Sequence, residues 1–404
     1  MRRCYGQLVR SLFLLRSLAG TGVVLLAGCS SAGAAAPAGG MPATAVARVQ
    51  HGASWRIVGV VRHCGDDGLL SVAASGRRDA WAVGVPSGCG ADVEHWDGSL
   101  WLHVVVPRGV TLADSPVAPW APVAASSGRD AWVFPVKGDP VNPYDYALRW
   151  DGASWRRSDF HSKLIVESAE AFGARDVWAF GFVEHPSGFV PYAARFGGRS
   201  WRRVKVPAET LAVTGTSPRN LWVFGPSLRT AGRPPARQAF IAVRWNGRSW
   251  HTIVVPKIPH RTVVEEVFLR PAAATTGPGN LWLAFPVTDR AGHPHVTVMH
   301  WHLGRWHRIA LPSPLVSGID GLASDGHGGI WLLADVIGNF NQSQYWYHYS
   351  AGHWTRQQVL SPHGYFGTLS AMAWVPGTTS VWAVGEADPD SRGHSLGVIA
   401  RYSP

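Results

Sequence analysis

The chain has 404 residues, of which 46% are hydrophobic and 16% charged, with 46 glycines, 29 prolines and 21 tryptophans. This composition is sufficient for a core, excludes a disordered or coiled-coil protein, and favours many short strands and turns over long helices. The formal net charge of +11 comes from basic residues spread along the chain, so the sequence does not indicate nucleic-acid binding.

The first 28 residues have the pattern of an export signal. Four arginines and no acidic residue lie before an apolar run over 18–27, which is too short for a permanent membrane helix of about 20 residues. The Leu-Ala-Gly-Cys segment at 26–29 resembles the lipobox of bacterial lipoproteins, and the resemblance implies that Cys29 is lipidated. We expect a signal peptide over 1–28 and a mature protein held outside the cytoplasm by a lipid anchor in the cell membrane.

Residues 29–50 are expected to form a flexible linker behind the lipid anchor. Positions 30–40 contain only Ser, Ala, Gly and Pro, a composition typical of extended tethers. The folded body is expected over 51–404. It would form one large domain, although a chain of this length usually makes two or three.

Two short patterns alternate along the folded body. The first is a small polar turn followed by Trp and an apolar strand, as in the Asp-Ala-Trp-Ala-Val-Gly segment at 79–84. The second is a basic residue, an aromatic residue, a turn with Gly and another Trp, as in the segment from His95 to Trp101. The first pattern recurs about every 50 residues, around Trp81, Trp132, Trp178, Trp222, Trp282, Trp331 and Trp382.

A repeat of this length with four strand-like segments is typical of β-propeller blades. In the first unit we expect strands A to D over 71–75, 80–85, 91–96 and 100–106. The body begins near Trp55 with a strand D that has no blade before it, and ends near Tyr402 with a strand C that has no strand D. Pairing of these two strands closes the ring and removes free sheet edges. The sequence therefore predicts an all-β, seven-bladed β-propeller of four-stranded antiparallel blades.

These motifs resemble bacterial secreted and lipoprotein propeller-repeat proteins and, more distantly, propellers of the kelch and galactose-oxidase type. The resemblance covers roughly 51–404. It implies the fold and leaves the function open, because propeller scaffolds carry enzymes, binding modules and assembly platforms alike.

Residues that recur in every unit are interpreted as structural. A basic residue precedes the strand C aromatic residue, and Asp or Asn precedes strand B in most units. We expect a polar clasp between the A–B and C–D turns on one face, and packing of the recurring Trp between blades. The basic residues are His95, Arg149, Arg195, Arg244, His300, His348 and Arg401, and the turn residues are Asp79, Asp130, Asp176, Asn220 and Asn280.

Five histidines between 293 and 307 are dense enough to suggest a zinc or copper site. His300 holds the recurring basic position, and His302 and His307 follow the recurring aromatic positions, so these three are interpreted as part of the repeat. Only His293 and His295 fall in a loop. We therefore predict no metal site and no cofactor.

The D–A and B–C connections are expected on the face opposite the clasps, where the central channel opens. Propellers commonly bind ligands there. Cys64 lies in a D–A connection and Cys89 in a B–C connection of the same blade, so the topology predicts a disulfide between them in an oxidising compartment. The alternative is a pair of unpaired, buried thiols.

Candidate site residues lie on this loop face. The position four residues after the recurring Trp is apolar in five units and acidic in the last two, at Asp335 and Glu386. Two such carboxylates can act as general acid and base in glycoside cleavage or hold a cation or basic group, and the alternative is solvated loop acids. Further ligand-binding candidates with polar or aromatic side chains are Tyr144, Asp145, Tyr146, Glu184 and His185.

Two functions follow from these patterns. The first is a monomeric, lipid-anchored binding module that presents its propeller to an envelope protein or carbohydrate and contacts the membrane only through the anchor. The alternative is a carbohydrate-active hydrolase or lyase that uses Asp335 and Glu386, although the sequence has no recognisable nucleophile motif. A copper oxidase of the galactose-oxidase type is disfavoured, because pairing of Cys64 with Cys89 leaves no Cys to cross-link with a Tyr.

Overall fold

The computed structural model divides the chain into residues 1–52 and residues 53–404, and the described residues all belong to the second unit. The signal peptide, the linker, Cys29, Tyr144, Asp145, and the pair Cys64 and Cys89 lie outside the described residues, so those statements stay predictions. Within the described part of the chain no helix is long and apolar enough to cross a membrane. The structure describes residues 54–62, 67–86, 92–107, 110, 122–135, 146–160, 164–185, 188–230, 238–257, 262–263, 270–289, 291–312, 316–337, 342–359, 367–387 and 395–403.

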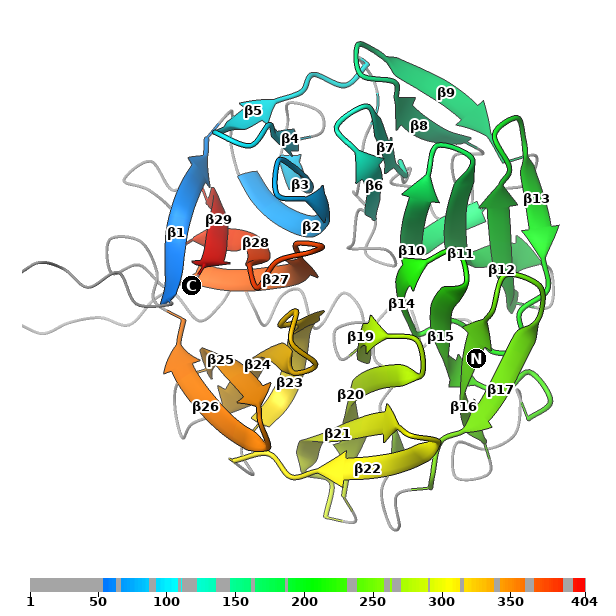
Figure 1. Cartoon of the computed structure of the whole chain (residues 1–404), viewed down its shortest axis with the longest axis vertical. Helices are drawn as coiled ribbons and strands as arrows, with labels where there is room; N and C mark the ends of the chain where they lie inside the picture. Colours follow the sequence, from blue (N-terminus) through cyan, green and yellow to red (C-terminus); the bar gives the residue numbers. More distant parts are fainter. Residues whose placement is uncertain are drawn as a thin grey trace, which may run out of the picture. The chain divides into compact units, whose positions relative to one another are not determined.

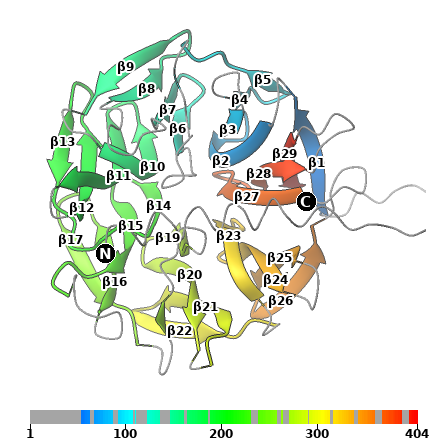
Figure 2. The ribbon, with the colours of Figure 1, turned by 180° about the vertical axis from the view of Figure 1, so that it is seen from behind.

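The second unit is a ring of seven antiparallel sheets, seen from one side in Figure 1 and from behind in Figure 2. The predicted seven-bladed β-propeller is confirmed. Blades 1 to 3 consist of β2 (Asp67–Gly76), β3 (Asp79–Pro86), β4 (Asp92–Trp96) and β5 (Trp101–His103); β6 (Val123–Ser127), β7 (Asp130–Val133), β8 (Tyr146–Trp150) and β9 (Trp155–Asp159); and β10 (Leu164–Gly173), β11 (Asp176–His185), β12 (Gly188–Phe196) and β13 (Trp201–Val204).

Blades 4 to 7 follow the same order from strand A at the centre to strand D at the rim. Blade 5 carries one extra short strand, β18, beside its strand B. These blades consist of β14 (Ala212–Ser217), β15 (Asn220–Pro226), β16 (Phe240–Trp245) and β17 (Trp250–Val254); β18 (Thr262–Val263), β19 (Ala272–Gly277), β20 (Asn280–Thr288), β21 (Pro294–His302) and β22 (Arg305–Ile309); β23 (Val316–Ser324), β24 (Ile330–Ile337), β25 (Gln342–Ser350) and β26 (His353–Gln358); and β27 (Gly367–Trp374), β28 (Val381–Ala387), β29 (Leu396–Ser403) and β1 (Ser54–Val61).

The seventh blade is completed by both ends of the folded unit, as predicted. Strand β1 runs antiparallel to β29, and Trp55 lies opposite Tyr402. The Trp55 ring also stacks on Trp346 of blade 6, with the ring centroids 3.6 Å apart. The closing strand is therefore held by its own sheet and by the neighbouring blade.

Burial falls from the axis to the rim and explains the composition of each strand. Strand B lies between two neighbouring strands and two neighbouring blades, and β15 is buried at every position. Strand D is the outer edge of its sheet, so β17 keeps Trp250 and Ile253 half-buried and exposes the rest. In blade 1, strand D extends only over 101–103 instead of the predicted 100–106, and Val105 beyond it is 75% exposed.

In blades 1, 3, 4 and 7 the residue three positions after the recurring Trp is Gly, and a close approach between strands A and B requires it there. A Cβ on Gly181 would lie 1.8 Å from the carbonyl oxygen of Ile165, and one on Gly385 would lie 2.1 Å from that of Thr368. Strand A bulges next to these contacts in β10 and β27, and a bulge bends a strand and sharpens its twist. Any side chain at this position would push strand A away from strand B.

The recurring strand B Trp packs between blades, as predicted. Trp81 meets Trp150 and Trp155 of the next blade at ring distances of 6.0 Å each. Trp382 closes the ring in the same way against Trp96 and Trp101, at 5.2 and 5.0 Å. Edge-to-face packing of this kind buries much area and adds about 0.5–1.5 kcal/mol for each pair.

The predicted clasp is present in five blades. In each, the basic side chain before the strand C aromatic residue reaches the polar side chain of the A–B turn. Blade 4 departs from the prediction, because Asn220 accepts from the Trp222 indole N–H at 2.9 Å and the Nε of Arg244 is buried without a hydrogen-bond partner among the described residues. The clasps join His95 with Asp79 (2.8 Å), Arg149 with Asp130 (2.9 Å), Arg195 with Asp176 (2.6 Å), His300 with Asn280 (2.6 Å) and His348 with Asp325 (3.1 Å).

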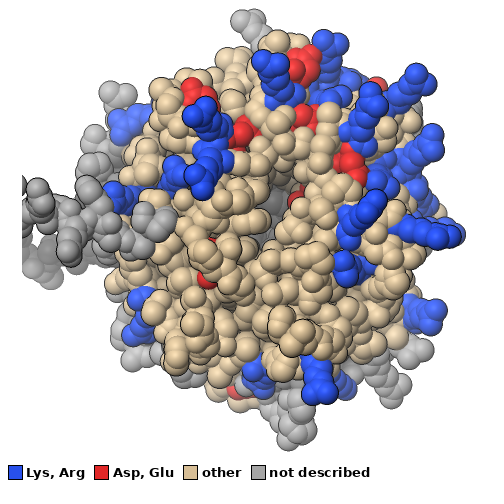
Figure 3. All heavy atoms as spheres, viewed as in Figure 1, with Lys and Arg blue, Asp and Glu red and all other residues tan. Residues whose placement is uncertain are grey.

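The positive charge is distributed unevenly over the folded unit. Figure 3 shows Lys and Arg side chains most densely along the right-hand rim, which is formed by blades 2 to 4. These blades follow one another in the chain, so the cations of this rim come from one continuous part of the sequence. The exposed cations of this rim include Arg156, Arg157, Arg202, Arg203, Lys205 and Arg248.

Candidate functional site

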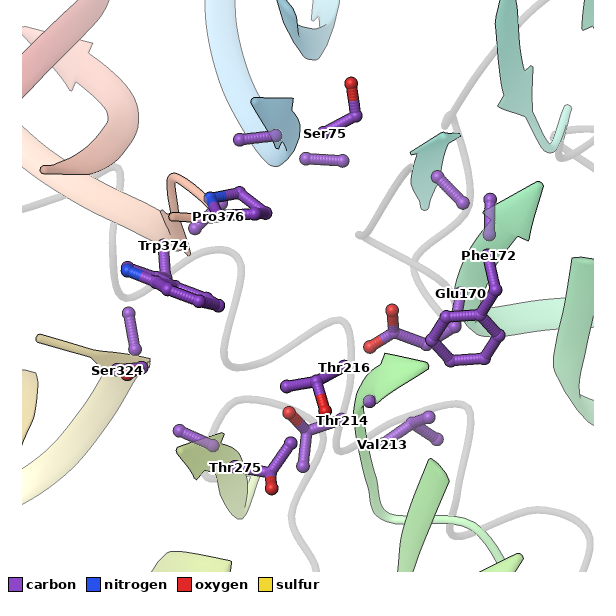
Figure 4. Close-up of a pocket in the computed structure, with 18 of the residues that line it drawn as sticks. Ser75, Glu170, Phe172, Val213, Thr214, Thr216, Thr275, Ser324, Trp374 and Pro376 are labelled. Carbon is purple, nitrogen blue, oxygen red and sulfur yellow. The ribbon is translucent and has the colours of Figure 1, made fainter. Parts of the chain in front are cut away.

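A cavity of about 620 Å³ lies at the centre of the ring. It is lined by the C-terminal ends of the A strands of all seven blades, namely β2, β6, β10, β14, β19, β23 and β27 (Figure 4). Most lining residues are Ala, Ser, Thr or Gly, whose small side chains leave the centre of the ring open.

Among the described residues that line this cavity, Glu170 is the only ionisable one. It departs from the repeat at one defined register, the strand A position paired with the recurring Trp of strand B. Figure 4 shows its carboxyl group directed toward the open centre. The residues at this register are Ala73, Ala124, Glu170, Thr214, Ala274, Ala323 and Ala373.

The surroundings of Glu170 favour the neutral acid. Burial among the inner strands raises the pKa of Glu170 from 4.5 to about 8, although the backbone N–H of Gly215, which donates to this carboxyl, opposes the shift. At pH 7 the side chain is therefore mostly protonated, and it offers one O–H donor together with carbonyl acceptor capacity. A neutral carboxyl of this kind forms hydrogen bonds with uncharged polar groups.

Hydroxyl groups surround the same space. The Thr276 hydroxyl is buried and has no hydrogen-bond partner among the described residues, which in a folded protein calls for a ligand or a water molecule. Thr216 accepts from the amide of Asn220 at 2.8 Å and retains its own O–H to donate. Figure 4 shows Thr214 and Thr216 on the side of the cavity next to Glu170.

Two aromatic side chains add flat apolar surfaces to this polar lining. Phe172 follows Glu170 on β10, and Trp374 ends β27 on another side of the cavity (Figure 4). The Phe172 ring lies directly over Gly215, where a Cβ would come within 2.5 Å of the ring. The indole N–H of Trp374 donates to the carbonyl of Thr378 at 2.7 Å, which fixes the ring.

A second group of charges lies farther along the A strands, on the side of the D–A connections. Arg270 of blade 5 forms an ion pair with Glu167 of blade 3, and this pair spans blade 4. Burial raises the pKa of Glu167 while Arg270 lowers it, and burial also raises the pKa of the nearby Glu209. We interpret this ion pair as a structural contact between blades 3 and 5, because each charge is neutralised by the other.

The acids predicted from the sequence have different neighbours in the structure. The carboxylate of Asp335 lies over Gly318 of its own blade, where a Cβ would come within 3.2 Å of Oδ2. The carboxylate of Glu386 lies against Gly68 of the next blade, where a Cβ would come within 2.9 Å of Oε2. Their joint catalytic role stays a prediction.

The other predicted ligand residues lie on blades 2 and 3, away from the blades of these acids. The Tyr146 ring packs at the edge of a hydrophobic cluster and is covered by the Arg157 guanidinium at 4.3 Å, as expected for a structural residue. Glu184 and His185 end β11 opposite Phe189 and Gly188, and His185 is exposed.

The histidines are divided between two environments. His293 and His295 lie 3.5 and 3.1 Å from Asp289, whereas His300 forms the blade 5 clasp. Burial, followed by the charges of His302 and His307, lowers the pKa of His300 to about 4. Among the described residues no group of three His, Cys, Asp or Glu side chains is placed to hold a metal ion.

No protein-family model and no curated protein matches the sequence. Among solved structures, the fold is similar to YCF48 bound to D1 peptide, with 14% identity over 87% of this chain and 95% of that chain and a TM-score of 0.50. YCF48 from Cyanidioschyzon merolae has 15% identity, 87% and 99% coverage, and a TM-score of 0.50. A six-bladed fucose-binding lectin from Aleuria aurantia has 14% identity, 74% and 98% coverage, and a TM-score of 0.43. The likeness is one of fold.

Proposed function

We propose that the protein is a binding module of the cell envelope whose central cavity holds part of an uncharged, hydroxyl-rich ligand, namely a carbohydrate. The single observation that carries this proposal is the lining of the cavity, where one neutral carboxyl is surrounded by hydroxyl groups and the described residues provide no second ionisable group. The export signal and the lipobox-like segment before Cys29 support a location outside the cytoplasm.

The chemistry of the lining fits a sugar. Protonated Glu170 and the Thr276 hydroxyl both donate and accept, as sugar hydroxyls do. Phe172 and Trp374 provide the flat apolar surfaces that pack against sugar rings. A charged ligand group would lose its hydration in the cavity without meeting an opposite charge.

Binding is favoured over hydrolysis, because glycoside cleavage requires two carboxyl groups on either side of the scissile bond, about 5–10 Å apart. The described lining of the cavity provides one carboxyl group, that of Glu170. A peptide ligand is the second candidate, since one similar propeller has been solved with a bound D1 peptide.

The test is a glycan array and an envelope-peptide array probed with a soluble form that begins at Val46, the Glu170→Gln variant and the Glu170→Ala variant. We expect capture of a glycan by the wild type at pH 7, weaker capture at about pH 9, where Glu170 ionises, and pH-independent capture by Glu170→Gln. Glu170→Ala should lose about tenfold in affinity, because one good hydrogen-bonding group contributes ~1.4 kcal/mol.

The matched control is the double variant Asp335→Asn, Glu386→Gln, which leaves the cavity unchanged and should capture the same glycan. Loss of capture in this control, with normal capture by Glu170→Ala, would move the site to the loop face and favour the carbohydrate-active alternative. Capture of peptides alone would replace the carbohydrate by the second candidate.

A further inference from the structure

Blade 7 differs from the other blades at its A–B turn. The turn runs over 375–380 and is closed by a hydrogen bond from the backbone N–H of Val375 to the carbonyl of Ser380, at 3.0 Å. Ser380 takes the place that Asp or Asn holds before strand B in blades 1 to 5. The clasp of blade 7 therefore has no acidic partner for its basic residue, Arg401.

Arg401 is consequently a half-buried cation for which the described part of the chain provides no matching anion. Its guanidinium lies over the rings of Trp382 and Trp96, at 4.8 and 5.8 Å. Its Nε is buried and has no hydrogen-bond partner among the described residues. Burial lowers the pKa of Arg401, as expected where no nearby carboxylate favours the charged form.

Arg401 lines an open pocket of about 710 Å³ on the side of the A–B turns. The pocket contains a second arginine, a histidine and four hydroxyl groups, and none of its described lining residues is acidic. Asp325, in the neighbouring turn, is already bonded to His348 at 3.1 Å and to the backbone N–H of His327 at 2.7 Å. The polar side chains that line the pocket are those of Arg77, His327, Thr378, Thr379, Ser380, Arg401 and Ser403.

The wall of the pocket is rigidly built. Gly326, with a φ of +79°, brings its turn against that of blade 7, where a Cβ would lie 2.1 Å from the carbonyl oxygen of Thr378. The Thr378 hydroxyl donates to the carbonyl of Val375 at 2.8 Å and accepts from the backbone N–H of Ser380 at 2.9 Å. Trp374 separates this pocket from the central cavity, because it lines both.

We propose that this pocket is a second binding site, which takes the oxyanion group of a ligand, a phosphate, sulfate or carboxylate, with Arg401 as its principal partner. A guanidinium offers a planar fork of donors that matches two oxyanion oxygens, and charge-assisted bonds of this type are about twice as strong as neutral ones. The ligand would supply the negative charge that the turn acid supplies in blades 1, 2, 3 and 6. The pocket is larger than a bare phosphate, so the oxyanion belongs to a larger molecule.

The decisive variant is Ser380→Asp. It introduces the acid found at this position in blades 1 to 3, gives Arg401 an internal partner, and should block the pocket while maintaining or raising the melting temperature. Arg401→Gln removes the cation directly, and Arg77→Gln removes the second, exposed one. Arg305→Gln, which removes an exposed arginine of β22, is the matched control.

Calorimetric titration of the full chain at low ionic strength would use three probes, inorganic phosphate, sulfate and glucuronate, to distinguish the sources of the oxyanion. We expect the wild type and Arg305→Gln to bind at least one probe with a Kd of about 1 mM or tighter. Ser380→Asp and Arg401→Gln should each weaken binding about tenfold or more, and Arg77→Gln by a smaller factor.

Wild-type affinity in Ser380→Asp or in folded Arg401→Gln would overturn the proposal. Absence of binding of all three probes to the wild type at about 10 mM would overturn it equally. If Arg401→Gln fails to fold, Ser380→Asp and Arg77→Gln still decide the matter. Glucuronate bound in the central cavity would keep its affinity in Ser380→Asp and lose it in Glu170→Ala, whereas phosphate and sulfate report on the Arg401 pocket alone, so the two proposals can fail or succeed independently.

Discussion

At the scale of single residues, seven copies of one unit act as an internal control. The register opposite the recurring Trp carries Ala in five blades, so Glu170 differs from its counterparts in both size and chemistry. The sequence holds this signal, because the position lies eight residues before the Trp in most units. The departure of Glu170 from the repeat is recognised only when the A strands of all blades are aligned. Such an alignment is difficult from the sequence, because strand A has no recurring aromatic residue.

Glu170 is expected to make stability depend on pH. Between pH 4.5 and 8 the folded protein keeps a proton that the unfolded chain has released, so the free energy of unfolding falls by up to ~1.4 kcal/mol per pH unit as pH rises. Glu170→Gln lacks this group. Denaturant unfolding at about pH 5.5 and about pH 9 should show the variant gaining stability over the wild type at the higher pH. An equal difference at both pH values would contradict the shifted pKa.

The clasp is expected to contribute substantially to stability where its acid is buried. Asp130 is 4% exposed and lies 2.9 Å from Arg149, so Asp130→Ala leaves a partly buried cation without a partner and should destabilise the fold by about 2–3 kcal/mol. Asp159→Ala breaks the exposed pair with Arg157 in the same blade and should change stability by less than about 0.5 kcal/mol. Chemical denaturation of both variants provides the comparison.

At the scale of strands, the repeated Trp motif combines two separate packing requirements. Trp fills the space between blades, whereas the Gly that follows three residues later in blades 1, 3, 4 and 7 allows strand A to approach strand B. The sequence predicts which segments become strands, because this motif is strong and local. The short strand D of blade 1 differs from the prediction, since an edge strand receives pairing from one side only and ends where its side chains reach solvent.

Gly181→Ala tests the second requirement. Its Cβ would meet the carbonyl of Ile165 at 1.8 Å, so strand A must move, and we expect a loss of about 2 kcal/mol or more. Gly197→Ala in the same blade is the control, because a Cβ there has no neighbour within 4 Å. Thermal melting should leave the control within about 0.5 kcal/mol of the wild type, and equal losses in both variants would refute the steric explanation.

At the scale of the whole unit, the ring architecture could be predicted because its two ends are complementary. The first strand is a strand D without a blade, and the last blade lacks a strand D. Pairing of the two completes seven four-stranded blades, and the pairing of β1 with β29 confirms this arrangement. The binding cavities could not be predicted in this way. Each is lined by side chains from several blades, and their joint geometry depends on how the blades tilt around the axis. The pocket lined by Arg401 depends in addition on the absence of an acidic residue from the A–B turn of blade 7. This absence is recognised only by comparison with the blades in which an acidic turn residue pairs with the basic residue of strand C.

Closure of the ring is expected to depend on Trp55. Removal of its ring in Trp55→Ala loses the stacking on Trp346 and the contact with Tyr402, which should lower the free energy of unfolding by about 2–3 kcal/mol. Val58→Ala on the same strand removes a side chain that is 48% exposed and should have little effect. Hydrogen exchange of β29 amides should accelerate in Trp55→Ala alone. Equal exchange in the two variants would show that the closing strand is held by its backbone pairing.

The pairing of β1 with β29 also makes completion of blade 7 depend on the last strand to be synthesised. During translation the first strand emerges long before its partner and must remain unpaired until residues 396–403 have left the ribosome. A product truncated before this point would retain a solitary leading strand and an exposed sheet edge on the last blade. Such an edge is prone to aggregation and to proteolysis. Truncated chains are therefore expected to aggregate or to be degraded more readily than full-length chains.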